Sequence, residues 1–243
     1  MNKKNKRSKK RFFPNSLTIF NMFFGFTSIV FIMKGEYIIA GVLILLAGFM
    51  DIFDGKIARL LGISSKFGVE FDSLADTVSF CVAPSILVYS LYAKDLQIIQ
   101  GLVLSFVPLI CGSVRLAKYN LETVEDNHKS YFIGLSTPIS TVTILAFMYF
   151  NHQIGGQDFY GDPNIALGLV LVLGILMLSP IHFPKVPLIT FKSSSKNSIL
   201  LIIMIACSLS IVVWKGFALL PVCLGYILTN TFLWFIKLRP SNI

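Results

Sequence analysis

Charged residues are scarce in this chain of 243 amino acids. Asp, Glu, Lys and Arg make up 14% of the sequence, whereas a typical soluble domain carries about 25%. Together with a hydrophobic fraction of 55%, this scarcity argues against a single soluble globular domain. The four cysteines are too few for a disulfide-stapled scaffold of this length, and the high apolar content excludes intrinsic disorder.

Positive charge is unevenly distributed along the chain. The formal net charge is +9, but residues 1–11 hold seven Lys and Arg residues and no acidic one, which leaves a net charge of +2 for the rest. This placement argues against a basic nucleic-acid-binding surface, so we expect no nucleic-acid partner. We predict that residues 1–13 form a basic cytoplasmic tail that sets membrane topology, with contact to anionic lipid as the alternative role.

Long apolar stretches dominate the remaining sequence. Eight of them approach the roughly 20 residues that a helix needs to cross about 30 Å of hydrocarbon. They cover residues 16–33, 37–60, 68–92, 97–117, 134–151, 164–181, 197–214 and 217–236. We predict an all-α polytopic membrane helical bundle of about eight transmembrane helices, with six as the alternative, in one domain over residues 14–243. The first stretch is interpreted as a permanent span, since no small-residue cleavage site follows it.

Lys and Arg residues indicate the orientation of the spans. With the N-terminus inside and eight crossings, 18 of the 21 Lys and Arg residues lie on the cytoplasmic side, as the positive-inside rule expects. We therefore predict an integral protein of the cell membrane whose two termini are cytoplasmic. The acidic segment described next then lies at the cytoplasmic ends of its helices.

Acidic residues gather in one short segment. Five of the 12 fall between positions 51 and 76, at the ends of the second and third apolar stretches. Carboxylates within membrane spans are costly and usually mark function. Asp51 and Asp54 are spaced to share one helical face, as are Asp72 and Asp76 on the next stretch. Two antiparallel helices joined by the short turn 61–67 would bring the four carboxylates together.

Four neighbouring carboxylates repel one another when all are ionised. Protonation or a bound cation relieves this repulsion, and oxygen ligands favour hard ions such as Mg²⁺, Ca²⁺ or Mn²⁺. The four cysteines and three histidines are scattered, so we expect no zinc or redox centre. A divalent-cation transporter that uses the same acids as a pathway, or interhelical hydrogen bonds without further function, are the alternatives to an enzyme.

The acidic segment matches a known motif. From Asp51 to Asp76 it reads D-x2-D-G-x2-A-R-x8-G-x3-D-x3-D, which resembles the signature of the CDP-alcohol phosphatidyltransferases. The fixed positions that it meets are Asp51, Asp54, Gly55, Ala58, Arg59, Gly68, Asp72 and Asp76. Residues 14–18, Pro-Asn-Ser-Leu-Thr, are also similar to the opening of that family. The resemblance implies a helical membrane enzyme in which an alcohol displaces CMP from a CDP-activated lipid and forms a phosphodiester.

The resemblance also implies roles for these residues. The cofactor would be a divalent cation, Mg²⁺ or Mn²⁺ with Ca²⁺ as a further candidate. Its ligands would be Asp51, Asp54, Asp72 and Asp76. Asp76 would lie near the acceptor as a metal ligand or as the catalytic general base. The residues that bind the CDP-lipid would be Gly55, Ala58, Arg59 and Gly68. Close helix packing is the alternative role of the glycines, and a topology charge that of Arg59.

Two later segments bear on the acceptor alcohol. Residues 115–120 read R-L-A-K-Y-N and residues 132–138 read F-I-G-L-S-T-P, and both are similar to the serine-using branch of the family. The departures from that branch are Lys118, Tyr119 and Ser136. We expect Arg115 and Lys118 to bind the serine carboxylate, with Asn120 as a third acceptor-binding residue. Glycerol 3-phosphate or an inositol phosphate is the alternative acceptor, and charges at the inner membrane boundary are the alternative role of the two cations.

The partners implied by the resemblance are CDP-diacylglycerol, L-serine and membrane lipid, with a homodimer as the assembly. We predict direct in-line displacement of CMP by the serine hydroxyl, because no Cys, His or Ser is placed in the motif as an obvious nucleophile. A covalent intermediate on an Asp is the alternative.

Overall fold

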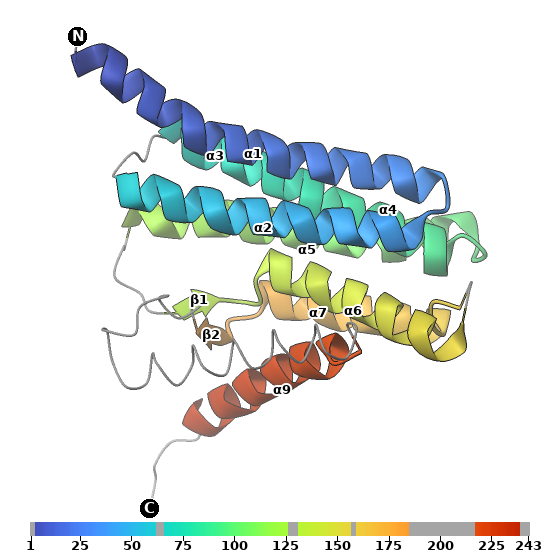
Figure 1. Cartoon of the computed structure of the whole chain (residues 1–243). Coiled ribbons are helices and arrows are strands. Elements are labelled where there is room, and N and C mark those ends of the chain that lie inside the picture. The colour runs from blue at the N-terminus through green and yellow to red at the C-terminus, as the bar shows by residue number, and fades with distance from the viewer. Residues whose placement is uncertain (1–2, 62–65, 126–130, 157–158, 185–216, 239–243) are drawn as a thin grey trace, which may run out of the picture.

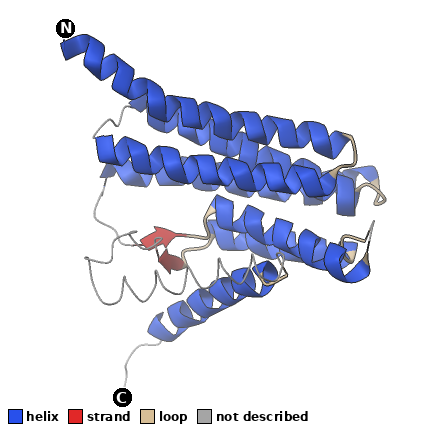
Figure 2. Cartoon of the chain, in the orientation of Figure 1, coloured by secondary structure: helices blue, strands red, loops and turns tan. Residues whose placement is uncertain are grey.

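The computed structural model of the chain consists almost entirely of helices (Figure 1, Figure 2). It describes residues 3–61, 66–125, 131–156, 159–184 and 217–238. The elements in chain order are α1 (Lys3–Met33), α2 (Tyr37–Leu61), α3 (Lys66–Thr77), η1 (Val78–Val82), α4 (Ala83–Val88), η2 (Tyr89–Ala93), α5 (Ile98–Glu125), β1 (Tyr131–Ile133), α6 (Thr137–Gly155), α7 (Pro163–Leu178), β2 (His182–Pro184) and α9 (Leu219–Leu238). The all-α prediction is confirmed. The two short strands, which form one antiparallel pair, are an addition to it.

Five helical segments among the described residues are long and apolar enough to cross a membrane. They are Ser16–Met33, Tyr37–Gly55, Phe67–Ala93, Ile98–Leu121 and Leu219–Ile236. α7 is apolar but shorter, and α6, which forms in the fifth predicted stretch, carries buried hydroxyl groups and is not among the five. The seventh predicted span, 197–214, lies outside the described residues. The chain is an integral membrane protein, and the number of eight crossings stays a prediction.

Helices α1 to α5 pack side by side, and α6, α7 and α9 cover one side of that group (Figure 1). α1 lies along α2 and contacts α3, while α5 contacts α3 and α7. The start of α1, the end of α2, the start of α3 and the β1–β2 pair all lie at the left end of the bundle in Figure 1. The basic N-terminal residues and the acidic motif thus share one end of the bundle, which agrees with the predicted layout.

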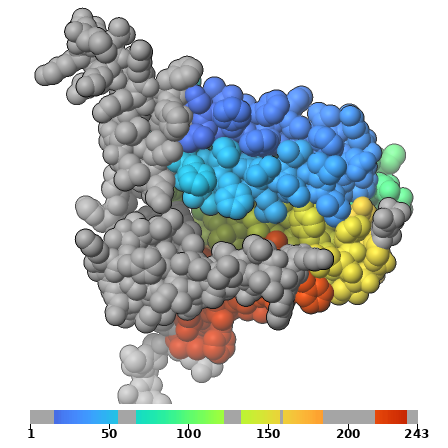
Figure 3. Space-filling view, viewed as in Figure 1, coloured from blue at the N-terminus to red at the C-terminus, as the bar shows by residue number. Residues whose placement is uncertain are grey.

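Large apolar side chains cover the outer surface of these helices. On α1, Phe23 and Phe26 are 56% and 59% exposed, and on α2, Phe49 and Ile52 are 57% and 60% exposed. α1 and α2 form one continuous outer face in Figure 3. An apolar face of this size would promote association in water, whereas in a bilayer it contacts lipid chains.

The third predicted span is a continuous helical run made of α3, η1, α4 and η2. The π-helical turn η1 begins shortly after Asp76, and Pro84 lies in the first turn of α4. Pro84 has no N–H to donate to the carbonyl four residues earlier, which belongs to Phe80. Thr141 Oγ1 of α6 donates a hydrogen bond of 2.9 Å to this carbonyl. The hydroxyl stands in for the missing donor, as side chains of neighbouring helices commonly do in membranes.

α5 continues beyond the predicted end of the fourth span. The predicted span ends at residue 117, whereas α5 extends to Glu125. The predicted end of this helix is therefore wrong, because the helix continues through residues 118–125. This segment contains neither Gly nor Pro, and its Leu, Lys and Glu residues favour a helix, so nothing in the segment ends the helix at the membrane boundary.

β1 precedes α6 and β2 follows α7, so the pairing of the two strands brings the start of α6 close to the end of α7. Gly134 donates its backbone N–H to the Ile181 carbonyl at 2.8 Å and has a φ of 76°, a conformation that glycine adopts at little steric cost. A Cβ atom at this position would collide with the backbone oxygen of Met177. Gly134 therefore permits the close packing of this segment against the end of α7.

Candidate metal centre

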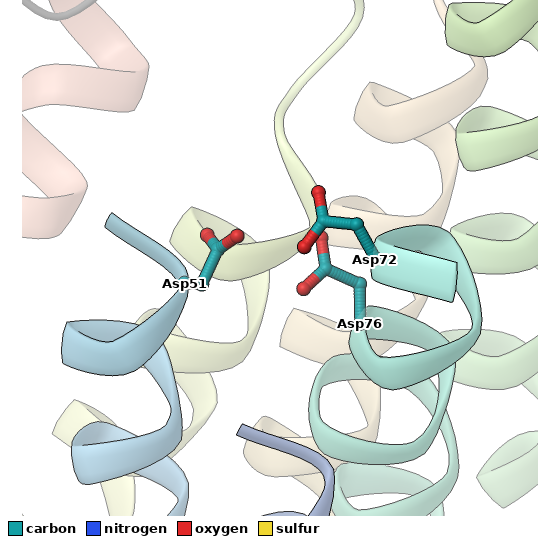
Figure 4. Close-up of side chains that lie close together, drawn as sticks. All are labelled: Asp51, Asp72 and Asp76. Atoms are coloured by element: carbon teal, nitrogen blue, oxygen red, sulfur yellow. The ribbon is translucent and has the colours of Figure 1, made fainter. Parts of the chain in front are cut away.

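The end of α2 and the start of α3 bring three motif carboxylates together (Figure 4). Asp51 extends from α2, while Asp72 and Asp76 extend from successive turns of α3. One carboxylate oxygen of each residue lies within 4.8 Å of those of the other two. Three of the four aspartates that the spacing predicts to converge thus form one group.

These three carboxylates suit a hard divalent cation. Asp76 is 9% exposed, and Asp72 Oδ1 is buried with no hydrogen-bond partner among the described residues. Negative charges this close repel strongly where water is largely excluded. An oxygen-only set of ligands is the kind that Mg²⁺, Mn²⁺ or Ca²⁺ prefers. The residues present therefore fit the cation that the family resemblance implies.

Asp54 is not one of these three clustered carboxylates. Its side chain is 4% exposed, and its Oδ2 accepts a hydrogen bond of 2.9 Å from Thr18 Oγ1 on α1. α1 therefore orients this carboxylate. The role of Asp54 as a fourth metal ligand stays a prediction.

α1 also contacts Asp76. Asn21 Nδ2 donates a hydrogen bond of 3.0 Å to Asp76 Oδ1, and Asn21 is fully buried. The carboxylate of Asp76 is thus bonded to α1 through one oxygen while it faces the carboxylates of Asp51 and Asp72 (Figure 4).

The motif glycines flank the carboxylates. Gly55 directly follows Asp54 in α2, Gly68 lies one turn before Asp72 in α3, and both glycines are half-buried. The side chains of Ala58 and Arg59 lie outside the described residues. Contacts of these residues with a CDP-lipid stay predictions.

Arg115 occupies a buried position on α5. Its side chain is 7% exposed, and its Nη1 donates a hydrogen bond of 3.2 Å to Thr137 Oγ1 at the start of α6. Its guanidinium carbon lies 5.5 Å from the centroid of the Tyr119 ring. A buried cation in a membrane span is costly and usually marks function.

A cavity of about 30 Å³ lies beside Arg115. Its lining residues are Arg115, Lys118, Tyr119, Ile133, Met177, Leu178 and Ser179. Arg115 and Lys118 thus line the same cavity, and their role in binding the acceptor stays a prediction. Asn120 is instead directed to α3, where its Nδ2 donates a hydrogen bond of 2.9 Å to Ser73 Oγ. The three residues expected to bind the acceptor therefore occupy two different surroundings.

Several polar residues at this site are not among the predicted site residues. They are Thr18, Asn21, Ser73 and Thr137. Thr18 and Asn21 lie 36 and 55 positions from their carboxylate partners, and no local spacing links such distant positions. The available signal is a polar Asn21 within an apolar run, because a polar side chain inside a membrane bundle commonly bonds to another helix.

Comparison with known proteins connects this geometry to a family. The family model described as CDP-alcohol phosphatidyltransferase matches residues 11–222. A Helicobacter pylori protein named CDP-diacylglycerol–serine O-phosphatidyltransferase is 33% identical over 226 residues, which cover 91% of this chain and 90% of that protein. The archaetidylserine synthase of Methanothermobacter thermautotrophicus is 35% identical over 175 residues, which cover 71% of this chain and 70% of that protein.

The matched region contains the complete acidic motif and both segments that bear on the acceptor. It also contains the three clustered carboxylates and their contacts with α1. The chain therefore belongs to the CDP-alcohol phosphatidyltransferase family.

Proposed function

We propose that this chain transfers the phosphatidyl group of CDP-diacylglycerol to the hydroxyl of L-serine, which yields phosphatidylserine and CMP. The observation that carries the proposal is the group of three motif carboxylates at one end of a membrane bundle. The name of the Helicobacter relative contains serine, and that of the Methanothermobacter relative contains archaetidylserine, which supports the choice of acceptor.

Positioning and electrostatics dominate phosphoryl transfer. A divalent cation, when bound, neutralises the diphosphate of the CDP-lipid and stabilises the charge of the departing CMP. In this proposal Asp51, Asp72, Asp76 and Asp54 would supply oxygen ligands for it. Asp76 accepts the proton of the serine hydroxyl. The serine oxygen then bonds to the phosphorus of the phosphatidyl group, and the bond from this phosphorus to the CMP oxygen breaks.

The displacement is direct in this proposal. Attack in line with the departing CMP inverts the configuration at phosphorus, whereas a covalent intermediate on an Asp would give two inversions and net retention. An isotopically chiral phosphorus in the CDP-lipid distinguishes the two. Retention in the product would reject direct displacement.

Arg115 and Lys118 are proposed to bind the serine carboxylate. A guanidinium can pair with a carboxylate through two parallel hydrogen bonds, and the ammonium of Lys118 adds a point charge. Glycerol 3-phosphate and inositol phosphates carry a phosphate dianion instead, which calls for more cations. Among the described residues that line the cavity, Arg115 and Lys118 are the cationic ones, and the names of the relatives, more than this count of charges, favour serine.

The reaction takes place at the cytoplasmic face of the cell membrane in this proposal. The basic N-terminal residues share one end of the bundle with the acidic motif, and the positive-inside rule places them inside. A water-soluble serine and the CDP headgroup then enter from the cytoplasm while the acyl chains stay in lipid. Mg²⁺ or Mn²⁺ as the cofactor, with Ca²⁺ as a further candidate, and a homodimer belong to the same proposal.

A competition assay tests the proposal. Purified protein receives CDP-diacylglycerol, Mg²⁺ and equal concentrations of serine, glycerol 3-phosphate and an inositol phosphate, and mass spectrometry identifies the product headgroups. We expect phosphatidylserine, an equal amount of CMP, and no product after chelation of the metal. A glycerol or inositol lipid as the main product would reject serine as the acceptor. Metal uptake by liposomes that lack CDP-lipid would favour a transporter instead.

A further inference from the structure

Helix α1 contacts the acidic motif through two side chains that lie outside it. Thr18 Oγ1 donates a hydrogen bond of 2.9 Å to Asp54 Oδ2, and Asn21 Nδ2 donates one of 3.0 Å to Asp76 Oδ1. Thr18 and Asn21 are three residues apart and share one face of α1, where they are 5% and 0% exposed. This face thus holds one carboxylate of α2 and one of α3.

A second set of contacts fixes α1 close to the motif. Ser79 Oγ in η1 donates a hydrogen bond of 3.0 Å to the backbone oxygen of Asn21. A Cβ atom at Gly25, one turn further along α1, would collide with Ser79. The lack of a side chain at Gly25 therefore lets the two helices approach closely enough for Asn21 to reach Asp76.

The orientation of the Asn21 amide indicates why an Asn lies here. An ionised carboxylate accepts hydrogen bonds and does not donate them, so the NH₂ group faces Asp76. Asn21 Oδ1 is left buried with no hydrogen-bond partner among the described residues. A buried polar atom without a partner is destabilising, and an apolar residue would avoid this cost. The charge-assisted bond to Asp76 offsets the cost and occupies one of the two carboxylate oxygens.

We propose that Thr18 and Asn21 are positioning residues of the metal centre. They select which oxygens of Asp54 and Asp76 stay available to the cation and to the acceptor hydroxyl. The inference rests on the proposed function, because it assumes that these carboxylates serve a bound cation. Removal of a residue that orients a metal ligand typically weakens metal binding or activity by about 10- to 100-fold.

Metal binding to the purified protein tests Asn21 without any turnover. The electron paramagnetic resonance signal of free Mn²⁺ measures the affinity in the absence of CDP-lipid. We expect Asn21→Leu, and Asn21→Ala as a smaller replacement, to weaken Mn²⁺ binding by about 10- to 100-fold. The Mn²⁺ concentration for half-maximal turnover should rise in parallel while the KM for serine stays unchanged. Ser28→Ala is the matched control on α1, since its hydroxyl donates to Gly25 O of the same helix, and it should bind Mn²⁺ as the wild type does.

Thr18 offers a conservative pair of variants. Thr18→Val removes the donor with little change in shape, and Thr18→Ser keeps it. We expect weaker Mn²⁺ binding in the first variant and near wild-type binding in the second. Ser79→Ala separates positioning from packing, because it removes the bond between η1 and α1 without removing a donor to either carboxylate. This variant should unfold at a lower temperature and keep its Mn²⁺ affinity.

The outcomes separate the two proposals. Wild-type Mn²⁺ affinity in folded Asn21→Leu and Asn21→Ala, or an equal loss of affinity in Ser79→Ala, would overturn the positioning role. Variants that lose serine affinity alone would overturn it as well. A wild-type protein that makes no phosphatidylserine, yet binds Mn²⁺ in an Asn21-dependent way, would overturn the proposed function and support the positioning role.

Discussion

Asn120 on α5 donates a hydrogen bond of 2.9 Å to Ser73 on α3, the residue that directly follows Asp72. This bond connects the helix that carries the proposed acceptor cations to the helix that carries two of the three clustered carboxylates. The Ser73 hydroxyl is itself directed by its own bond to the Val69 carbonyl one turn earlier. A specific side-chain contact therefore contributes to the spacing between the two proposed substrate sites.

We expect the Asn120 and Ser73 side chains to be energetically coupled. Asn120→Ala, Ser73→Ala and the double variant form a cycle whose coupling free energy should be about 0.6 kcal/mol, the average for hydrogen bonds between membrane helices. Equilibrium unfolding in mixed detergent micelles measures it. Strictly additive losses would show that this bond does not hold α3 and α5 together.

Arg115→Ala should raise the KM for serine by about 10- to 100-fold, since a hydrogen bond to a charged group contributes about 1.5–3 kcal/mol. The KM for CDP-lipid should change less. Arg115→Lys keeps the charge but loses the planar fork, so its KM for serine should lie between those of the wild type and the Ala variant. Lys94→Ala, in the exposed connection before α5, is the control and should leave both values unchanged. An unchanged KM for serine in Arg115→Ala would remove this residue from the acceptor site.

Asp76→Asn should lower turnover by about 10²- to 10⁴-fold, the usual contribution of a general base. The amide has nearly the same size as the carboxylate but cannot take the proton of the serine hydroxyl. CDP-lipid binding, measured by calorimetry in the presence of Mg²⁺, should be weakened less than in Asp51→Asn. Near-normal turnover would reject the role of Asp76 as the base, and equal losses of binding in both variants would show that Asp76 contributes to CDP-lipid binding as much as Asp51 does.

Thr141→Val should destabilise the fold by about 1 kcal/mol, because the Phe80 carbonyl loses a buried hydrogen-bond donor. Pro84 cannot replace it. The control is Thr229→Val on α9, whose hydroxyl donates to the Gly225 carbonyl of its own helix at 2.6 Å. Equilibrium unfolding measures the free energy that each variant loses. Equal losses would mean that the bond between Thr141 and Phe80 stabilises the fold no more than a hydroxyl bond within a single helix does.

Hydropathy predicted the helices, and residue spacing predicted a carboxylate cluster, because both depend on local sequence. Apolar stretches correspond to helices because every backbone polar group in a bilayer must be satisfied internally. The spacing of Asp51, Asp72 and Asp76 predicted a shared cluster because helical geometry relates residues three and four positions apart. The end of α5 was not predicted, since hydropathy falls in the polar residues after position 117 while the helix continues to Glu125.

Local sequence patterns could not predict the contacts between distant segments of the chain. Nothing local to Thr18 or Asn21 indicates which carboxylate each one meets, because their partners lie on other helices. Asp54 bonds to Thr18 and is not one of the three clustered carboxylates, a difference that the motif alone could not predict. The β1–β2 pair has three residues per strand, too few for an alternating pattern to be recognised.

The length of α7 leads to a further expectation. Its 16 residues extend over about 24 Å at 1.5 Å per residue, less than the roughly 30 Å of a typical hydrocarbon core. We expect turnover to be faster in vesicles with shorter acyl chains, where this mismatch is smaller. Initial rates in vesicles of matched headgroup and graded chain length measure the effect. The same rate at every thickness would contradict it.

The short α7 leads to a second expectation, which concerns how serine reaches its proposed binding site. Its last residues, Met177 and Leu178, border the cavity that holds Arg115. We expect the bilayer beside this short helix to thin locally, which would bring the headgroup layer closer to that cavity. Serine dissolved in water would then reach the proposed binding groups without entering the hydrocarbon core, and the thickness of the host membrane would influence how the substrate arrives.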